Sequence, residues 1–154
     1  MDVTSMRKSV GEFLAVAEGG GFGPPPAGEW DAEHNLAHVA SALASGAAAA
    51  LAIAAGQRVV YDNRVSLDEW NLQRIVDGAG GLPGLIDLVR RYGELVCEVA
   101  AGLTERERDV SLNVLIVSKD QLIVDQPRPI GSLLTGLCET HLPPHADQLR
   151  GLRG

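Results

Sequence analysis

Residues 30–55 of the chain read WDAEHNLAHVASALASGAAAALAIAA, and this stretch decides the fold. It contains no proline and a single glycine, Gly46, so it is predicted to form one long helix from about Trp30 or Asp31 to about Ala55. An aspartate at the start can accept hydrogen bonds from the free amides of the first turn. The alanine-rich second half would let a neighbouring helix approach closely, which favours a buried helix. Its leucine-poor composition disfavours a membrane span.

Three further long helices are predicted from apolar residues that recur at helical spacing. They cover about Val3 to Ala17, Pro83 to Leu103 and Ile130 to Leu142. A shorter helix is expected to begin with a capping box at 66–69 and to end near Val76. Residues 57–65 are expected to form a connector. The fold class predicted is all-α, a four-helix bundle in a single domain of residues 1–154.

Residues 113–125 depart from the helical pattern. Two β-branched runs, at 114–117 and 122–124, flank the polar tripeptide 118–120, and this arrangement is typical of a small β-hairpin inserted into the bundle. A helix over 110–117 fits equally well, because short apolar runs do not distinguish the two. Pro127 and Pro129 are expected to interrupt the chain before the last helix.

All four histidines fall into two pairs of equal spacing, His34 with His38 and His141 with His145. Residues four apart lie on the same face of a helix, so each pair can direct two imidazoles toward one point. Neutral imidazole is the commonest side-chain ligand of divalent transition metals, and a catalytic site needs three protein ligands and one open position. The pattern therefore indicates a metal site between two helices.

The motifs around these histidines resemble those of the DinB-like four-helix-bundle superfamily. A Gly-Glu-Trp tripeptide at 28–30 precedes His38 as in the second helix of that superfamily, and residues 140–149 resemble its H-x-x-x-H-x-x-Q-[LI] motif in the fourth. The resemblance spans nearly the whole chain by motif order. It implies that His38, His141 and His145 bind a divalent metal, Zn²⁺ or Ni²⁺.

The resemblance also implies a class of activity. The superfamily includes bacillithiol transferases, mycothiol-dependent maleylpyruvate isomerases and metal-dependent hydrolases. The chain is accordingly expected to be a thiol-dependent transferase or isomerase, or a hydrolase. It would act on a small-molecule substrate, with a low-molecular-weight thiol as co-substrate in the first two cases. The alternative is a non-catalytic bundle that binds a small ligand or self-associates as a homodimer, without metal.

Two features of the motifs leave alternatives open. Pro143 and Pro144 stand between the last two histidines and disfavour a straight helix through both. Either a kink directs both rings toward His38, or a new helical turn begins at Pro143 with His141 in the joint. His34 has no place in the motif, so it is a fourth ligand, a hydrogen-bond partner of a ligand or a polar residue near the helix start.

Charge and composition restrict the remaining function classes. The formal net charge of −7, with no cluster of lysine and arginine, argues against a nucleic-acid partner. The N-terminus has no secretory signal pattern, and the predicted location is cytoplasmic, without a membrane partner. Cys97 and Cys138 lie far apart without a C-x-x-C pattern and are expected to pack as small apolar residues.

Overall fold

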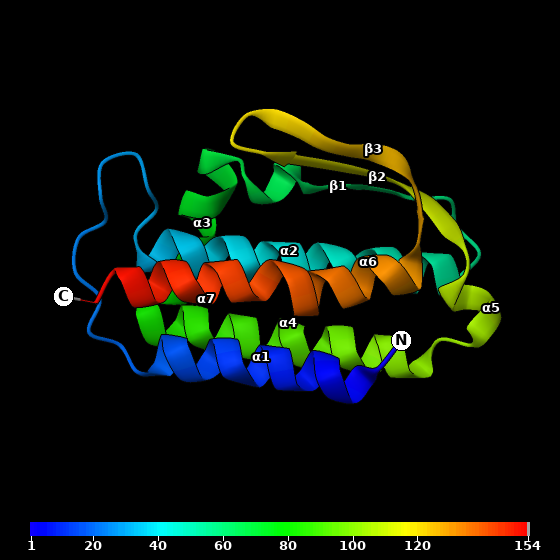
Figure 1. Cartoon of the computed structure of the whole chain (residues 1–154), viewed down its shortest axis with the longest axis horizontal. Helices are drawn as coiled ribbons and strands as arrows, with labels where there is room; N and C mark the ends of the chain where they lie inside the picture. Colours follow the sequence, from blue (N-terminus) through cyan, green and yellow to red (C-terminus); the bar gives the residue numbers. More distant parts are fainter. Residues whose placement is uncertain (154) are drawn as a thin grey trace.

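The computed structural model describes residues 1–153, which form a mostly helical fold with one small three-stranded sheet (Figure 1). The elements in chain order are α1 (Val3–Glu18), α2 (Ala32–Ala54), β1 (Val60–Asp62), η1 (Asn63–Ser66), α3 (Glu69–Ala79), α4 (Leu82–Gly102), α5 (Glu105–Arg108), β2 (Ser111–Ser118), β3 (Gln121–Pro129), α6 (Ile130–Gly136), η2 (Leu137–His141) and α7 (Leu142–Gly151).

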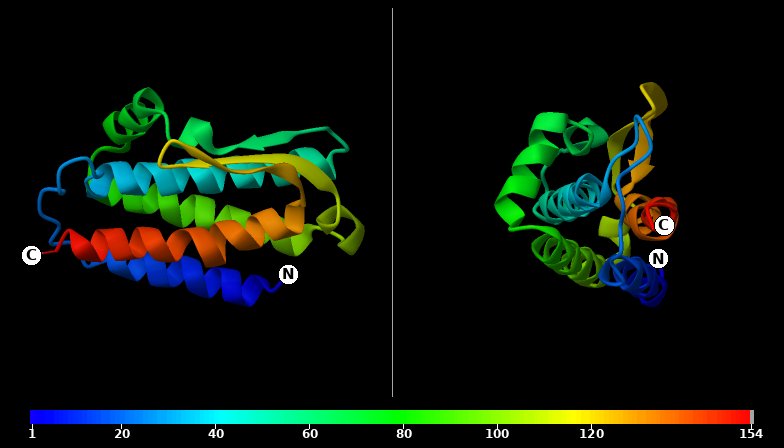
Figure 2. Two further views of the ribbon diagram at one scale, coloured as in Figure 1. Left: turned by 45° about the horizontal axis from the view of Figure 1, so that its top comes forward. Right: turned by 90° about the vertical axis from the view of Figure 1, so that its left-hand side faces the viewer.

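Four long helical segments pack side by side: α1, α2, α4, and a fourth formed by α6, η2 and α7 without interruption (Figure 2). The predicted helical class is confirmed in this coarse form. Their facing sides bury one apolar core, to which α2 contributes the fully buried Leu36, Val39 and Leu43. Cys97 and Cys138 are both buried free thiols in that core, as expected from their apolar surroundings.

Helix α2 is in close contact with both α4 and the fourth segment. Its length and apolar composition would suffice to cross a membrane, but most of the helix is buried inside the fold. The single glycine of α2 has a packing role. A side chain at Gly46 would collide with the Cδ1 methyl of Leu137, so glycine here lets the fourth segment lie close to α2.

The fourth segment contains a π-helical turn, η2, directly before Pro143 and Pro144. Proline lacks the amide that an α-helix uses, and its ring obstructs the carbonyl four residues earlier. The wider π turn shifts the register of the backbone, so both prolines fall in the first turn of α7, where no donor is required. Of the two alternatives for the prolines, the structure therefore has the new helical turn with His141 at the joint. The helix continues to Gly151, well beyond the predicted end at Leu142.

The sheet has the strand order β1-β2-β3, with β1 parallel and β3 antiparallel to the central β2, and it covers α2 and α6 on one side (Figure 1). The hairpin alternative for 113–125 is therefore correct, and the sheet is larger than expected. Two expectations are wrong. The connector 57–65 contains strand β1, and Pro127 and Pro129 lie within β3, an edge strand in which a missing amide donor is tolerated.

The short helix α3 begins later than the capping box predicted. The side chain that caps it belongs to Asp68, whose Oδ1 accepts from the backbone amide of Asn71 at 2.9 Å. Ser66 lies in the preceding turn η1, where its hydroxyl donates to the carbonyl of Asn63 at 2.8 Å. This difference matters for the site, because it leaves the Ser66 carbonyl free to accept from elsewhere.

We expect Gly46→Val to destabilise the fold by about 1–3 kcal/mol, because the new side chain would overlap Leu137 in a packed core. The matched control is Gly11→Val on the exposed side of α1, where a Cβ would meet nothing within 4 Å. The control should change stability by less than about 0.5 kcal/mol. Urea unfolding of both variants measures this, and equal stabilities would contradict the packing role of Gly46.

Candidate metal centre

Three imidazoles from two helical segments converge in the space between α2 and the fourth segment. His38 Nε2 lies 2.9 Å from His141 Nε2, and His145 Nε2 lies 3.1 Å from the same atom. One ligand nitrogen of each ring lies within 4.8 Å of the other two. The structure thus brings together the three histidines that the motif pattern indicated.

Each ring is positioned by a different local feature of the chain. His38 lies in α2, is only 3% exposed, and its ring reaches the carbonyl of Ser66 in η1. His141 ends the π turn, and His145 lies in the first turns of α7. The wide turn and the proline start therefore carry both C-terminal rings to one place, with His141 and His145 in contact at a ring-centroid distance of 4.5 Å.

Hydrogen bonds at the far side of two rings fix their orientation. His38 Nδ1 donates to the carbonyl oxygen of Ser66 at 2.6 Å, and His145 Nδ1 donates to Oε1 of Gln148 at 2.7 Å. Gln148 is held in turn by Asn35, whose Nδ2 donates to the same Oε1 at 2.8 Å. A proton on Nδ1 leaves the Nε2 lone pair free, so both rings present an acceptor to the centre.

The sheet holds the Ser66 carbonyl in place. The side-chain amide of Asn63 pairs with the backbone of Val117 in β2, donating to its carbonyl at 2.9 Å and accepting from its amide at 2.8 Å. The Ser66 hydroxyl in turn donates a hydrogen bond to the carbonyl of Asn63, across the turn η1. The small sheet is therefore connected to His38 through a continuous chain of hydrogen bonds.

The donor set fits a metal ion better than it fits hydrogen bonding among the rings. His38 and His145 both present lone pairs to His141 Nε2, and a single proton on that atom can satisfy only one of them. Two nitrogens bound to one tetrahedral Zn²⁺ are about 3.3 Å apart, close to the two distances observed. Three imidazoles suit Zn²⁺ and Ni²⁺, and they leave a position open in a tetrahedral site.

Burial keeps these rings neutral, which is the form that binds metal. Desolvation, together with the nearby His145 and His38, lowers the pKa of His141 to about 2. Desolvation and the nearby His38 lower the pKa of His145 to about 4, against the opposing hydrogen bond to Gln148. Desolvation also lowers the pKa of His38, and its hydrogen bond to Ser66 opposes this shift. All three are therefore unprotonated at neutral pH.

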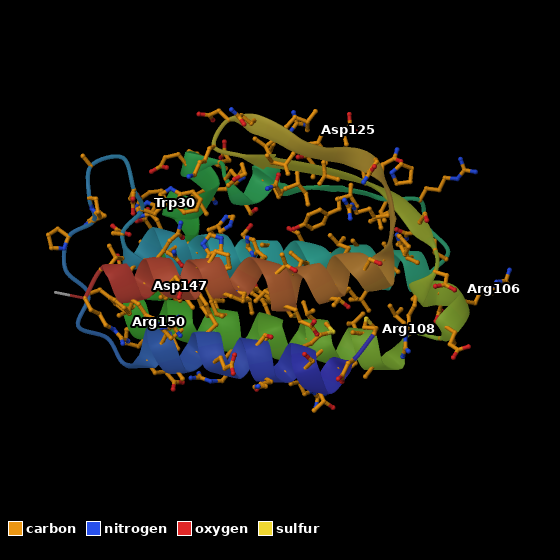
Figure 3. The ribbon with its side chains drawn as sticks, viewed as in Figure 1. Trp30, Arg106, Arg108, Asp125, Asp147 and Arg150 are labelled. Carbon is orange, nitrogen blue, oxygen red and sulfur yellow. The ribbon has the colours of Figure 1, made fainter. Side chains whose placement is uncertain are left out.

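Trp30 covers one side of this cluster. Its ring centroid lies 4.9 Å from that of His38, and the two planes are tilted by 41°. Figure 3 shows Trp30 near the start of α2, beside the loop that leads into the helix. A half-buried indole at this place limits access of water to His38 from that side.

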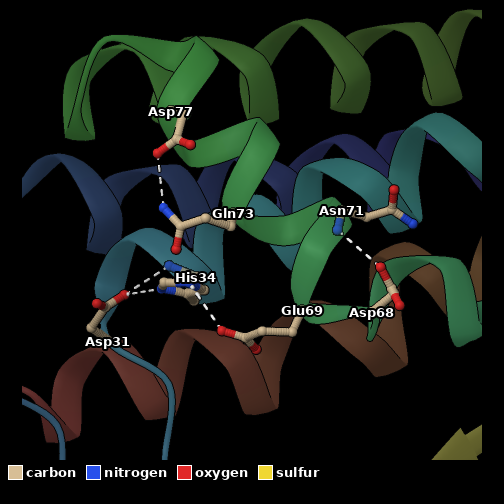
Figure 4. A network of polar contacts seen from close by, with 7 residues as sticks. All are labelled: Asp31, His34, Asp68, Glu69, Asn71, Gln73 and Asp77. Carbon is tan, nitrogen blue, oxygen red and sulfur yellow. Dashed lines mark hydrogen bonds and ion pairs between the residues drawn. The ribbon is translucent and has the colours of Figure 1, made fainter.

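His34 lies one turn before His38 but belongs to a different network (Figure 4). Its Nδ1 donates to Oδ1 of Asp31, the residue that caps α2, at 2.9 Å, and its Nε2 lies 3.6 Å from Oε1 of Glu69 in α3. Of the three alternatives for His34, the polar residue near the helix start is therefore the one found. It joins the start of α2 to α3 and takes no part in the triad.

A cleft of about 1300 Å³ opens beside the triad, between the sheet and the fourth helical segment. Its wall includes His141 and His145 on one side and Tyr61 and Asn63 on the other, together with residues of the hairpin. Tyr61 is buried, and desolvation raises the pKa of its phenol. A small molecule in this cleft can reach the open side of the cluster.

Comparison of the chain with protein-family models, with curated proteins and with solved structures finds no match.

Two partners of the histidines were not predicted from sequence: Ser66, which acts through its backbone, and Asn35. A backbone carbonyl leaves no signal in the sequence. Asn35 does leave one, because it lies in α2 three residues before His38 and is only 1% exposed. A buried amide on an otherwise apolar helix is a signal that could have indicated it. Asp147, next to Gln148 in the sequence, pairs with Arg150 on the outer face of α7 (Figure 3).

We expect Gln148→Met to weaken Zn²⁺ affinity about 10–100-fold, because His145 loses the acceptor that orients its ring. Gln73→Met is the matched control, since Gln73 bonds only to the exposed Asp77 on α3 (Figure 4). Competition titration against a zinc chelator gives both affinities. Equal affinity in the two variants would show that Gln148 does not orient a metal ligand.

Proposed function

We propose that this chain is a metal-dependent enzyme acting on a small molecule, with Zn²⁺ or Ni²⁺ held by His38, His141 and His145. The observation that carries the proposal is the convergence of three Nε2 atoms, two of them on rings whose Nδ1 donors are already occupied. Bound there, the metal would supply Lewis acidity that lowers the pKa of a thiol or a water molecule.

The number of ligands supports a catalytic rather than a structural role. Structural zinc sites are closed by four protein ligands, whereas catalytic sites use three and keep one position open. Among residues 1–153, no Cys, Asp or Glu joins the three histidines as a candidate ligand. The adjacent cleft gives the fourth position access to a substrate.

We further propose membership of the DinB-like superfamily. In support, His38 lies on the second long helix and the other two ligands lie on the fourth, in the order of the motifs that the sequence resembles. By that resemblance the reaction is a thiol-dependent transfer or isomerisation, or a hydrolysis. The chain's own residues would then orient the substrate in the cleft and exclude water through Trp30 and the sheet.

The decisive test is the metal content of protein purified without a histidine tag. We expect wild-type protein to bind about one equivalent of Zn²⁺ or Ni²⁺, and His38→Ala and His141→Ala to lose it, because two imidazoles rarely hold these ions tightly. His34→Ala is the matched control and should keep the metal, since His34 lies outside the triad. Elemental analysis with calorimetric titration measures all four proteins.

Loss of metal from His34→Ala to the same extent would place the site elsewhere. Wild-type protein that holds no metal and shows no affinity on titration would favour the alternative, a non-catalytic bundle. Once binding is established, assays of thiol transfer and of hydrolysis on metal-loaded protein distinguish the reaction classes.

A further inference from the structure

The cleft beside the triad has a charge opposite to that of the chain. Three cations line it, namely Arg108, Lys119 and Arg128, against two carboxylates, Glu105 and Asp109. Both carboxylates and Arg108 lie in or directly after α5, which packs on α6 at the far end of the fourth segment from α7 (Figure 1). Lys119 and Arg128 line the rest of the cleft, where the lining includes no carboxylate. In a chain of net charge −7, a cleft lined by this excess of cations attracts anions.

Lys119 is the cation at the end of the cleft nearest the triad. It lies two residues after Val117, whose backbone is paired with Asn63, and Asn63 begins the turn η1 whose Ser66 carbonyl binds His38. Within residues 1–153, no carboxylate lies within ion-pair distance of its ammonium. Lys119 is therefore free to bind an acid group that enters beside the histidines.

The backbone at Lys119 is a second observation. Lys119 and Asp120 form the two-residue turn of the hairpin with φ values of +49° and +60°, a left-handed conformation that favours glycine or asparagine. Non-glycine residues in this conformation concentrate at functional sites. A lysine at a position where glycine would be less strained is consistent with use of its side chain.

The strand register shows which side chains face the cleft. Arg128 is paired with Leu112, two positions along β2 from the buried Val114, so all three lie on the inner face of the sheet. Asp125 is paired with Leu115 on the opposite face and points away from the helices (Figure 3). At these positions the inner face therefore presents a cation and apolar side chains, while the carboxylate of Asp125 points outward.

We infer that the cleft binds a small anionic molecule, a carboxylate with an apolar body, whose acid group is held by Lys119 while its body lies against Tyr61 and Val114. The inference rests on the proposed function in treating this molecule as the candidate substrate. Arg128, nearly the length of β3 away, contributes to the attraction without touching the same acid group.

The test compares 4-phenylbutyrate with its neutral isostere 4-phenylbutanamide by NMR titration at pH 8, where His38, His141 and His145 are neutral. Protein is freed of metal with a chelator and then dialysed, so that neither metal nor chelator contributes to binding. We expect wild-type protein to bind the acid at least about 10-fold more tightly than the amide, because only the acid can form a charge-assisted hydrogen bond with Lys119. Binding should change the chemical shifts of the backbone amides in the hairpin.

Lys119→Gln should abolish this preference, while Lys8→Gln, on the exposed face of α1 and outside the cleft lining, should keep it. Arg128→Gln removes the same charge from the distant part of the cleft and should keep most of the preference. No preference in wild-type protein, no saturable binding at millimolar acid, or equal losses in the Lys119 and Arg128 variants would overturn the inference.

The two proposals fail separately. An acid preference found in a protein without metal affinity leaves the anion site standing and removes only the metal. A protein that binds metal but shows no acid preference loses the anion site alone, because the titration is carried out without metal.

Discussion

The hydrogen bond between His38 Nδ1 and the Ser66 carbonyl joins the two parts of this fold. On one side is the core helix α2, which buries His38 almost completely, and on the other is the small sheet, which holds Ser66 through Asn63. A buried imidazole needs an acceptor for its proton, and a carbonyl can only accept. This one contact therefore sets which nitrogen of His38 faces the cluster.

The π turn is the second constraint, and it arises from covalent chemistry. Pro143 and Pro144 cannot continue an α-helix, so the chain widens for one turn and begins again at Leu142. Turns of this kind are frequent at functional sites because they shift side chains out of the α-helical register. Here the shift leaves His141 and His145 in contact, each with Nε2 directed inward.

Sequence reasoning found what depends on local chemistry. The alanine-rich helix followed from composition, and the histidine triad followed from spacing and motif resemblance. The contacts between distant segments could not be predicted from the sequence. Strand β1 is only three residues long and exists because β2 pairs with it, and Ser66 acts through its backbone. The capping box failed because Asp68 competes with Ser66 for the same helix start. Such outcomes depend on neighbours that the local sequence does not contain.

The central claim is that the three Nε2 lone pairs converge, and histidine ¹⁵N NMR of metal-free protein tests it most directly. Two-dimensional spectra of labelled protein at pH 8 distinguish the two neutral tautomers of each ring. The account predicts that His38 and His145 carry their protons on Nδ1, held by Ser66 and Gln148. Protons on Nε2 of both rings would contradict it, because the lone pairs would then point away from the centre.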